Sequence, residues 1–489
     1  MRYLPDVLGP GFGATKLQLE PDQISPRSAT LVRYTPAEDP KSQLPDRVVP
    51  VNVKPGGGPN QGSFRILPPS ASPQQRAGSY PNHSDAAAQW DDSPAKNLDY
   101  LQDYLTSELR GREIEAVDEL DAPSAPQFIA VYVHGWNDYF YQAHLARMMA
   151  HLGAAFYAID LHRYGRNMPR QSGIIPYNCY EDDYTTYDRE LDWAIATARQ
   201  EHPDLPLVVM AHSNGGAVVS GWASRHHDAY DGLIFISPWV VQDVSGIPAG
   251  NTVRTVIAKY MKRLHIPMLG PGSTVYQDSL VGYATIGSPL PRRLVPFGND
   301  PAVHGWVTNP QWRINNGAPI LFGWLSAILS TQQWLVDHAS FSNQPVLCLT
   351  AAHDPDDFYH PEIARVDHLM AQKRKSAGMP PLCQNLLKHR LYWSTMSKSI
   401  LSKSNISEQE TPYETALVDW SEAARHTDTV LNGNLIEERI NTLYGQVGGG
   451  LTLRQMSGLH DLTLSQPLER AEFFAEVAAW ITHSGILSK

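Results

Sequence analysis

The stretch Val-Val-Met-Ala-His-Ser-Asn-Gly-Gly-Ala, residues 208–217, is the most informative part of this chain. An apolar segment, Leu207–Met210, runs directly into Ala211-His212-Ser213-Asn214-Gly215, and small residues follow. A serine flanked by small residues two positions away on each side predicts a sharp strand-to-helix turn, which is too crowded for larger side chains. Such a turn presents a nucleophilic serine. Taken alone, the pattern also fits a serine that caps a helix after a buried strand.

Three further segments accompany this one along the chain. Residues 128–137 form an apolar run that ends in His134-Gly135-Trp136, and Phe156–Asp160 is a second candidate for a buried strand. Leu451–Met456 is a third, and the loop after it, residues 457–462, contains a histidine, His460. The agreement of the four segments favours a catalytic serine over a simple helix cap.

Together these segments resemble the α/β-hydrolase superfamily, and within it the serine aminopeptidase-like and monoacylglycerol-lipase-like branch. The motifs that carry the resemblance are His134–Asp138, Asp160–Arg166, His212–Gly216 and Gly458–Leu462. The chain departs from the family at Asn167, where a glycine is usual. The resemblance implies an α/β-hydrolase fold, with a mostly parallel central sheet, helices on both faces and an inserted lid.

Strand and helix patterns alternate along the predicted core, but inserted segments interrupt them. We expect the first part of the core at residues 1–36 and 127–239 and the second part at 344–354 and 426–489. The expected interruptions are a Pro/Gly/Ser-rich insertion at 37–126, a lid at 240–343 and a second insertion at 355–425. In the first insertion, Asn97–Leu109 has the spacing of a helix.

The resemblance also assigns roles in the site. Ser213 is the expected nucleophile and His460 the expected general base. The backbone N–H groups of Trp136 and Asn214 are the expected oxyanion hole. His134 and His212 are expected to be structural.

The catalytic acid has two candidates. Asp354 follows the strand predicted at Pro345–Leu349 at the usual short distance. Asp428 follows the second insertion and precedes His460 by 32 residues, with a helix and a strand between them, which is the usual layout. Asp354 precedes His460 by 106 residues. We therefore favour Asp428 and keep Asp354 as the alternative.

Apolar residues recur at helical spacing in the predicted lid. They are Ile320, Leu321, Trp324, Leu325, Ile328 and Leu329. This stripe predicts packing inside the lid, the wall of an acyl pocket, or both. Trp324, Leu325 and Ile328 are the candidates for contact with substrate.

Composition excludes several classes of protein. The 489 residues carry a net charge of −11, which argues against a nucleic-acid binder. Three cysteines give neither a disulfide framework nor a zinc spacing, and we expect no metal and no cofactor. The first ten residues lack the long apolar region of a signal peptide, and no apolar run is long enough to span a membrane. We therefore expect a cytoplasmic protein.

The resulting hypothesis is a serine hydrolase that cleaves an ester, thioester or lactone of a largely apolar small molecule. The same fold and residues could instead serve a serine peptidase or an acyltransferase, because they fix chemistry better than substrate. A non-catalytic binding protein with the same fold is a third alternative. The oligomeric state stays open.

Overall fold

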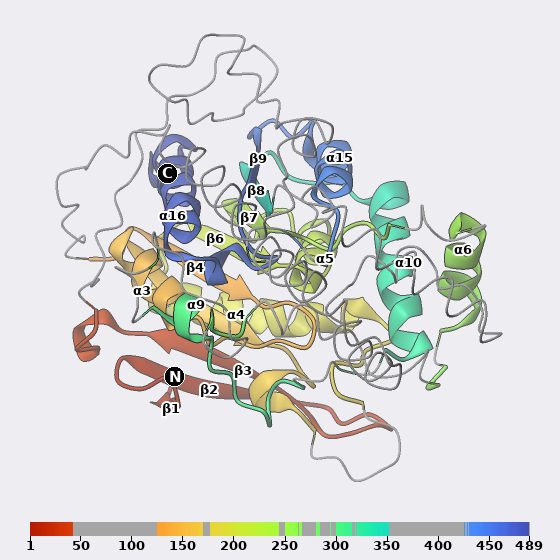
Figure 1. The fold of residues 1–489 in the computed structure, drawn as a ribbon, viewed down its shortest axis with the longest axis horizontal. Coiled ribbons are helices and arrows are strands. Elements are labelled where there is room, and N and C mark those ends of the chain that lie inside the picture. The colour runs from red at the N-terminus through yellow and green to blue at the C-terminus, as the bar shows by residue number, and fades with distance from the viewer. Residues whose placement is uncertain are drawn as a thin grey trace, which may run out of the picture.

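The computed structural model describes residues 1–42, 125–169, 177–243, 250–262, 264–266, 280–283, 294, 300–314, 318, 320–351, 425, 428 and 430–488. Within these ranges the chain forms one nine-stranded sheet with helices packed on both faces (Figure 1). No helix in the described ranges is long and apolar enough to cross a membrane.

The sheet has the strand order β1-β2-β3-β5-β4-β6-β7-β8-β9. Strands β1 to β3 are an antiparallel lead-in, and β3 also pairs antiparallel with β5. All the remaining neighbours pair parallel. The strand bounds are Leu4–Pro5, Phe12–Leu19, Arg27–Tyr34, Phe128–Val133, Ala154–Asp160, Leu207–His212, Gly232–Ile236, Val346–Ala351 and Leu451–Met456, from β1 to β9.

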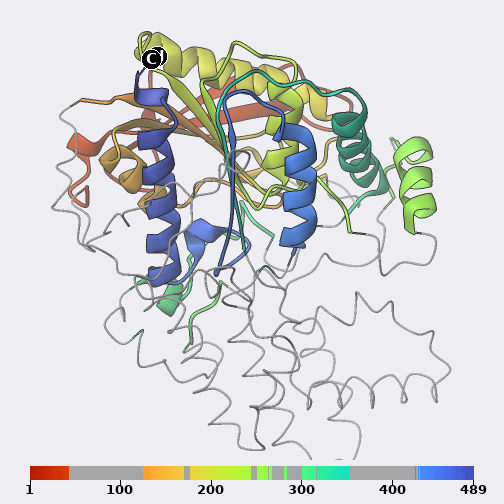
Figure 2. The same ribbon diagram turned by 90° about the horizontal axis from the view of Figure 1, so that it is seen from above.

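Helices cover the sheet on both sides. Helices α3 (Ala143–His151) and α16 (Pro467–His483) cover one face. The other face carries α4 (Asp188–Glu201), α5 (Asn214–Ala223), α10 (Phe322–His338) and α15 (Gly433–Tyr444). In Figure 2 the dark blue α16 and the lighter blue α15 lie on opposite sides of the sheet. Helix α6 (Gly250–Tyr260) packs against α10 on its outer side, and α9 (Pro301–His304) is a single turn.

The central strands are mostly apolar because both of their faces are covered. In β4, Val131 packs into the cluster beneath α4, α5, α10 and α15, and its neighbour Tyr132 packs into the cluster beneath α3 and α16. Every residue of β4 is buried, as is every residue of β6. This is the mostly parallel α/β architecture predicted from the sequence, and the prediction is confirmed.

Strained backbone conformations occur at the carboxyl ends of the parallel strands. Asn137, Arg163, Ser213 and Ser237 follow β4, β5, β6 and β7, and their φ angles are 53°, 63°, 50° and 41°. Residues other than glycine adopt positive φ rarely, at a cost of about 1–3 kcal/mol each. In a parallel α/β sheet this is the edge where ligands bind, at the carboxyl ends of the strands.

Two features expected from the sequence lie wholly or partly outside the described residues. The helix expected at Asn97–Leu109 lies outside the described residues. The lid expected at 240–343 is described only in parts, which include α6, α9 and α10.

Candidate active site

Ser213 occupies a strained turn between β6 and α5. Its φ of 50° and ψ of −118° lie outside the helical region, and it immediately precedes the first helical residue. Although it holds the N-cap position, its side chain makes no capping hydrogen bond to α5. The backbone is instead held by neighbouring segments, because the Ser213 N–H donates to Ile236 O at 3.0 Å and the Trp239 N–H donates to Ser213 O at 2.7 Å. The helix-cap interpretation therefore does not explain this serine.

Glycines allow the surrounding segments to approach the turn. A Cβ added at Gly215 would lie 2.5 Å from His134 O, and one added at Gly216 would collide with the Pro238 ring. A Cβ at Gly135 would lie 3.1 Å from Ser213 Cβ. The loop after β4, residues 134–142, therefore packs directly against the serine, and we call it the oxyanion loop after the donor expected from Trp136.

The Asp428 carboxylate faces His460. Its Oδ2 lies 2.8 Å from His460 Nδ1, and both residues are buried. Its Oδ1 accepts hydrogen bonds from the Val430 and Leu431 N–H groups, each at 2.8 Å. The two amides fix the carboxylate, so that one oxygen is held toward the imidazole.

The segment that follows Asp428 lies against the end of β8. A Cβ at Gly433 would lie 2.6 Å from Ala351 O, the last residue of that strand. Gly433, five residues after Asp428 in the sequence, therefore lies beside the end of β8. The alternative acid, Asp354, lies outside the described residues.

The ring of His212 links the histidine loop to the serine turn. Its centroid lies 4.9 Å from that of His460, and the next residue is Ser213. Burial lowers the pKa of His212 to about 4, with Asp461 opposing the shift, so this ring is neutral at pH 7.

His134 has a structural place in the oxyanion loop. Its Nε2 accepts a hydrogen bond from the Leu161 N–H at 3.1 Å, and its Nδ1 lies 2.7 Å from Gly135 O. Both ring nitrogens are thereby used in joining the loops after β4 and β5. This arrangement agrees with the structural role expected for His134.

The two expected oxyanion donors lie at the carboxyl ends of β4 and β6. Asn214 is the first residue of α5, where backbone N–H groups have no partner within the helix. Its side chain is fixed, because Tyr184 OH donates to Asn214 Oδ1 at 2.7 Å. Trp136 packs its ring on Trp324 of α10, with centroids 5.1 Å apart.

The apolar stripe of the predicted lid lies on and just before α10. Leu321, Trp324, Ile328 and Leu329 are buried in the core cluster, and Ile320 and Leu325 pack against it partly exposed. Trp324 lies between two other tryptophans, since its ring is 5.1 Å from Trp136 and 5.5 Å from Trp239. Much of the stripe is therefore core packing, and its Trp324 end reaches the oxyanion loop.

A segment of the lid region clamps the oxyanion loop. The Asn137 side chain donates to Ile314 O and accepts from the Ile314 N–H, both at 3.0 Å. The Asn309 N–H donates to Tyr139 OH at 2.8 Å. The sequence did not indicate this clamp, because asparagines and tyrosines in loops carry no spacing signal.

Asn167, where the chain departs from the family, also has a structural role. Its Nδ2 donates to Asp160 O at 2.8 Å, and its Oδ1 accepts from Thr30 Oγ1 at 2.7 Å. It thereby fastens the loop after β5 to β3.

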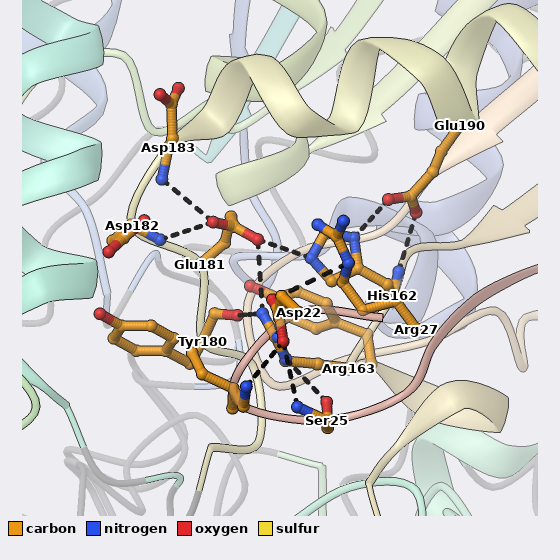
Figure 3. Close-up of polar contacts among 12 residues, drawn as sticks. Asp22, Ser25, Arg27, His162, Arg163, Tyr180, Glu181, Asp182, Asp183 and Glu190 are labelled. Atoms are coloured by element: carbon orange, nitrogen blue, oxygen red, sulfur yellow. Dashed lines mark hydrogen bonds and ion pairs between the residues drawn. The ribbon is translucent and has the colours of Figure 1, made fainter. Parts of the chain in front are cut away.

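A buried charge cluster also holds the loop after β5 (Figure 3). The imidazole of His162 lies between two glutamates, with Glu190 on Nδ1 and Glu181 on Nε2 at 2.8 Å. Burial alone would lower the pKa of His162, but the two carboxylates outweigh it and raise the pKa. Burial likewise works against ionised Glu181, but His162 and Arg163 lower its pKa overall. Arg163 also pairs with Asp22 from the β2–β3 loop.

A further set of polar residues, not indicated by the sequence, lies behind the serine turn. It consists of Asp138, His212 and Asp461, all buried. Burial raises the pKa of Asp138 to about 7, and Arg313 opposes that shift.

Comparison with known proteins identifies a family and several similar proteins. The family model of the serine aminopeptidases, S33, matches residues 124–374, just over half of the chain. A monoacylglycerol lipase of Mycolicibacterium smegmatis is 25% identical over 180 residues, which are 37% of this chain and 57% of that relative. The match therefore spans little more than half of the relative's length.

Solved structures with similarity to the chain include two lipases. One is a soluble variant of monoglyceride lipase from Saccharomyces cerevisiae in complex with a substrate analogue, at 11% identity and a TM-score of 0.40, covering 74% of this chain and 89% of that one. The other is the monoacylglycerol lipase of Paleococcus ferrophilus, at 13% identity and a TM-score of 0.39, covering 74% and 96%.

Proposed function

Because the chain belongs to the serine aminopeptidase S33 family of α/β-hydrolases, we propose that it is a serine hydrolase that cleaves carboxylic esters of apolar substrates. The observation that carries the proposal is the buried Asp428–His460 pair, whose imidazole lies 4.9 Å from the ring of His212, the residue next to a strained serine whose side chain makes no helix-capping bond.

In the proposed mechanism, Ser213 Oγ attacks the carbonyl carbon of the ester. Its proton passes to His460 Nε2, because Nδ1 faces Asp428 at 2.8 Å. Asp428 holds the imidazole in the required tautomer and stabilises its charged form. The Trp136 and Asn214 N–H groups receive the developing oxyanion, and losing one such donor typically costs about 3–4 kcal/mol.

The acyl-enzyme then forms as the carbon–oxygen bond to the alcohol breaks, and the alcohol leaves with the proton from His460. Water attacks the acyl carbon in the second half of the reaction, and His460 accepts the proton of that water. Ser213 is regenerated as the acid departs.

The preference for apolar substrates rests on the tryptophans beside the oxyanion loop. Trp136, the proposed oxyanion donor, packs on Trp324, which also contacts Trp239. Aromatic rings at this place favour an acyl chain or another apolar group next to the reacting carbonyl. Apolar surface removed from water contributes about 25 cal/mol per Å².

The nucleophile is tested with a fluorophosphonate probe, which labels activated serines covalently. We expect Ser213→Ala to abolish both labelling and the hydrolysis of p-nitrophenyl esters, while its thermal melting stays close to that of the wild type. The matched control is Ser237→Ala, because Ser237 is also strained and follows the adjacent strand β7. Full activity in Ser213→Ala would refute the mechanism.

A substrate panel separates ester from peptide cleavage. It contains p-nitrophenyl esters of increasing acyl length, monoacylglycerols, in view of the named relatives, and aminoacyl p-nitroanilides. We expect the highest kcat/KM among the longer esters. A preference for the anilides would assign the same residues to a peptidase.

A further inference from the structure

Three buried side chains from distant parts of the sequence converge behind the serine turn. Asp138 follows β4, His212 ends β6, and Asp461 follows β9. One potential ligand atom from each lies within 4.8 Å of the other two. Their exposed fractions are 1%, 2% and 0%.

Two of these side chains have unsatisfied polar atoms. Within the described part of the chain, neither ring nitrogen of His212 has a hydrogen-bond partner, and the Asp138 carboxylate is stabilised by no more than a long ion pair with Arg313 and the Tyr139 N–H. The near neighbours stand beyond hydrogen-bond distance, since Arg313 Nη1 lies 3.7 Å from Asp138 Oδ1 and His212 Nδ1 lies 3.9 Å from Asp461 Oδ2. Buried polar groups normally have partners, because leaving them without one is costly. A single bound group that contacts all three residues would satisfy them together.

We propose that Asp138, His212 and Asp461 form a binding site for one divalent transition-metal ion of the Zn²⁺ type. Two carboxylate oxygens and one imidazole nitrogen are ligands that Zn²⁺ accepts, whereas Ca²⁺ and Mg²⁺ take oxygen ligands. Bonds of about 2.1 Å in tetrahedral geometry would bring the ligand atoms to about 3.4 Å from one another. Since the ligand atoms lie within 4.8 Å of one another, the separations would have to shorten by up to about 1.4 Å.

The surroundings hold Asp461 in the orientation of a ligand. Its Oδ1 accepts from the Thr463 N–H at 3.0 Å and from Thr463 Oγ1 at 2.7 Å. Gln142 Nε2 donates to its Oδ2 at 3.0 Å and also reaches Tyr132 OH at 3.3 Å. Metal-binding carboxylates typically have such hydrogen-bonded outer partners. Arg313 lies on the Oδ1 side of Asp138, which leaves Oδ2 for the ion.

The position of the site gives the ion a structural role. Asp138 lies two residues after Trp136, His212 precedes Ser213, and Asp461 follows His460. One ion would therefore join the oxyanion loop, the serine turn and the histidine loop. Since all three ligands are buried, the ion would stabilise the loops without touching substrate.

The inference is tested on the full chain without an affinity tag, by measurements that do not depend on ester hydrolysis. The protein is stripped with a chelator and titrated with ZnCl₂ by calorimetry, and CoCl₂ is used as a visible-absorption probe. We expect one tight site per chain, a Zn²⁺-dependent rise in Tm, and a cobalt spectrum without the charge-transfer band of a thiolate ligand.

Asp138→Asn should weaken Zn²⁺ binding by at least tenfold and remove the rise in Tm. The matched control is Asp300→Asn, which changes a buried carboxylate that pairs with Arg470 outside this cluster and should keep wild-type affinity. Should Asp138→Asn fail to fold, Gln142→Leu removes an outer partner of Asp461, and a loss of about 10–100-fold in affinity is expected.

Two results would overturn the inference. One is the absence of stoichiometric Zn²⁺ or Co²⁺ binding to the wild type, in which case the cluster holds a proton or a water molecule. The other is unchanged affinity in both Asp138→Asn and Gln142→Leu, which would place the metal elsewhere. Loss of activity in Ser213→Ala does not affect either result, so the proposed function and this site are judged separately.

Discussion

At the scale of single residues, the two carboxylate oxygens of Asp428 have different partners: one bonds to backbone N–H groups and the other faces the His460 imidazole. Oδ1 accepts two N–H groups, and Oδ2 lies 2.8 Å from His460 Nδ1. An asparagine at this position could keep the backbone bonds through its carbonyl oxygen. Its amide would then face His460 with a donor in place of an acceptor.

We therefore predict that Asp428→Asn lowers kcat by about 10⁴-fold with little change in Tm, as expected when the histidine is held in the wrong tautomer. Steady-state kinetics on a p-nitrophenyl ester measure the loss. Asp354→Asn is the comparison and should lower kcat far less. If Asp354→Asn gave the larger loss, the acid would have to be reassigned.

The sequence indicated Ser213 and His460 because each follows an apolar strand closely, and Asp428 because a helix and a strand separate it from His460 in the usual layout. It could not indicate the cluster of Asp138, His212 and Asp461, because 74 and 249 residues separate its successive members. Only the parallel pairing of β4 with β6, and of the strands beyond, brings them together. Contacts that depend on tertiary structure leave no local pattern.

At the scale of elements, the start of α5 depends on close packing with the loop after β4. We predict that Gly215→Ala reduces kcat/KM by more than tenfold, because the added Cβ would lie 2.5 Å from His134 O and would displace the oxyanion loop. Kinetics on a short ester measure the effect.

The matched control is Gly221→Ala in the same helix. There the added Cβ meets only the flexible end of Arg225, at 3.4 Å. Alanine is favoured over glycine within helices by about 1 kcal/mol. Gly221→Ala should keep its activity and gain stability. Equal activity in the two variants would show that close packing of the loop after β4 on the start of α5 is not needed for activity.

Helix α10 is predicted to set acyl-chain preference. Leu325→Ser and Trp324→Phe should lower kcat/KM for long-chain esters more than for acetate esters, by up to about 0.8 kcal/mol for each methylene that loses its contact. Val336→Ser, at an exposed position of the same helix, is the control. An equal loss on short and long esters would mean that the stripe is packing within the lid.

Periodicity predicted most elements, but not α16. Its residues Glu469, Glu472 and Glu476 are buried, so the helix has no charged outer face by which its sequence could be oriented. Glu476 reaches Arg454 on β9 at 2.9 Å. Burial of paired charges overrides the amphipathic pattern on which sequence interpretation depends.

At the scale of the whole molecule, the His162 cluster ties the antiparallel lead-in to the parallel core. Asp22 contributes from the β2–β3 loop, Glu190 from α4, and Glu181 from the chain before it (Figure 3). Removing one partner of a buried ion pair typically costs about 3–5 kcal/mol, because the other charge stays buried.

We predict such a loss of unfolding free energy for His162→Gln, measured by denaturant titration. Arg225→Gln breaks a partly exposed pair with Asp188 and should cost about 1 kcal/mol or less. A cost for His162→Gln no larger than that of the control would show that the cluster adds little stability.

The pKa shifts fix how the effect of His162 varies with pH. Folding raises the pKa of His162. The contribution of His162 to the free energy of unfolding is therefore fully present below the pKa of a free histidine, and it is lost as pH rises through the pKa of the folded state. Since folding lowers the pKa of Glu181, its contribution is lost as pH falls through the folded value. The stability difference between wild type and His162→Gln should therefore shrink toward alkaline pH.

The order of the proposed triad along the chain has a consequence for biosynthesis. Ser213 emerges from the ribosome 247 residues before His460. At about 5–20 residues per second, the nascent chain carries its nucleophile for roughly 12–50 s before the base is synthesised. Among the described residues, the strand that leads to His460, β9, pairs with β8 alone at the edge of the sheet. The proposed triad would therefore stay without its base, and the chain without hydrolytic activity, until β9 and the loop after it have been translated.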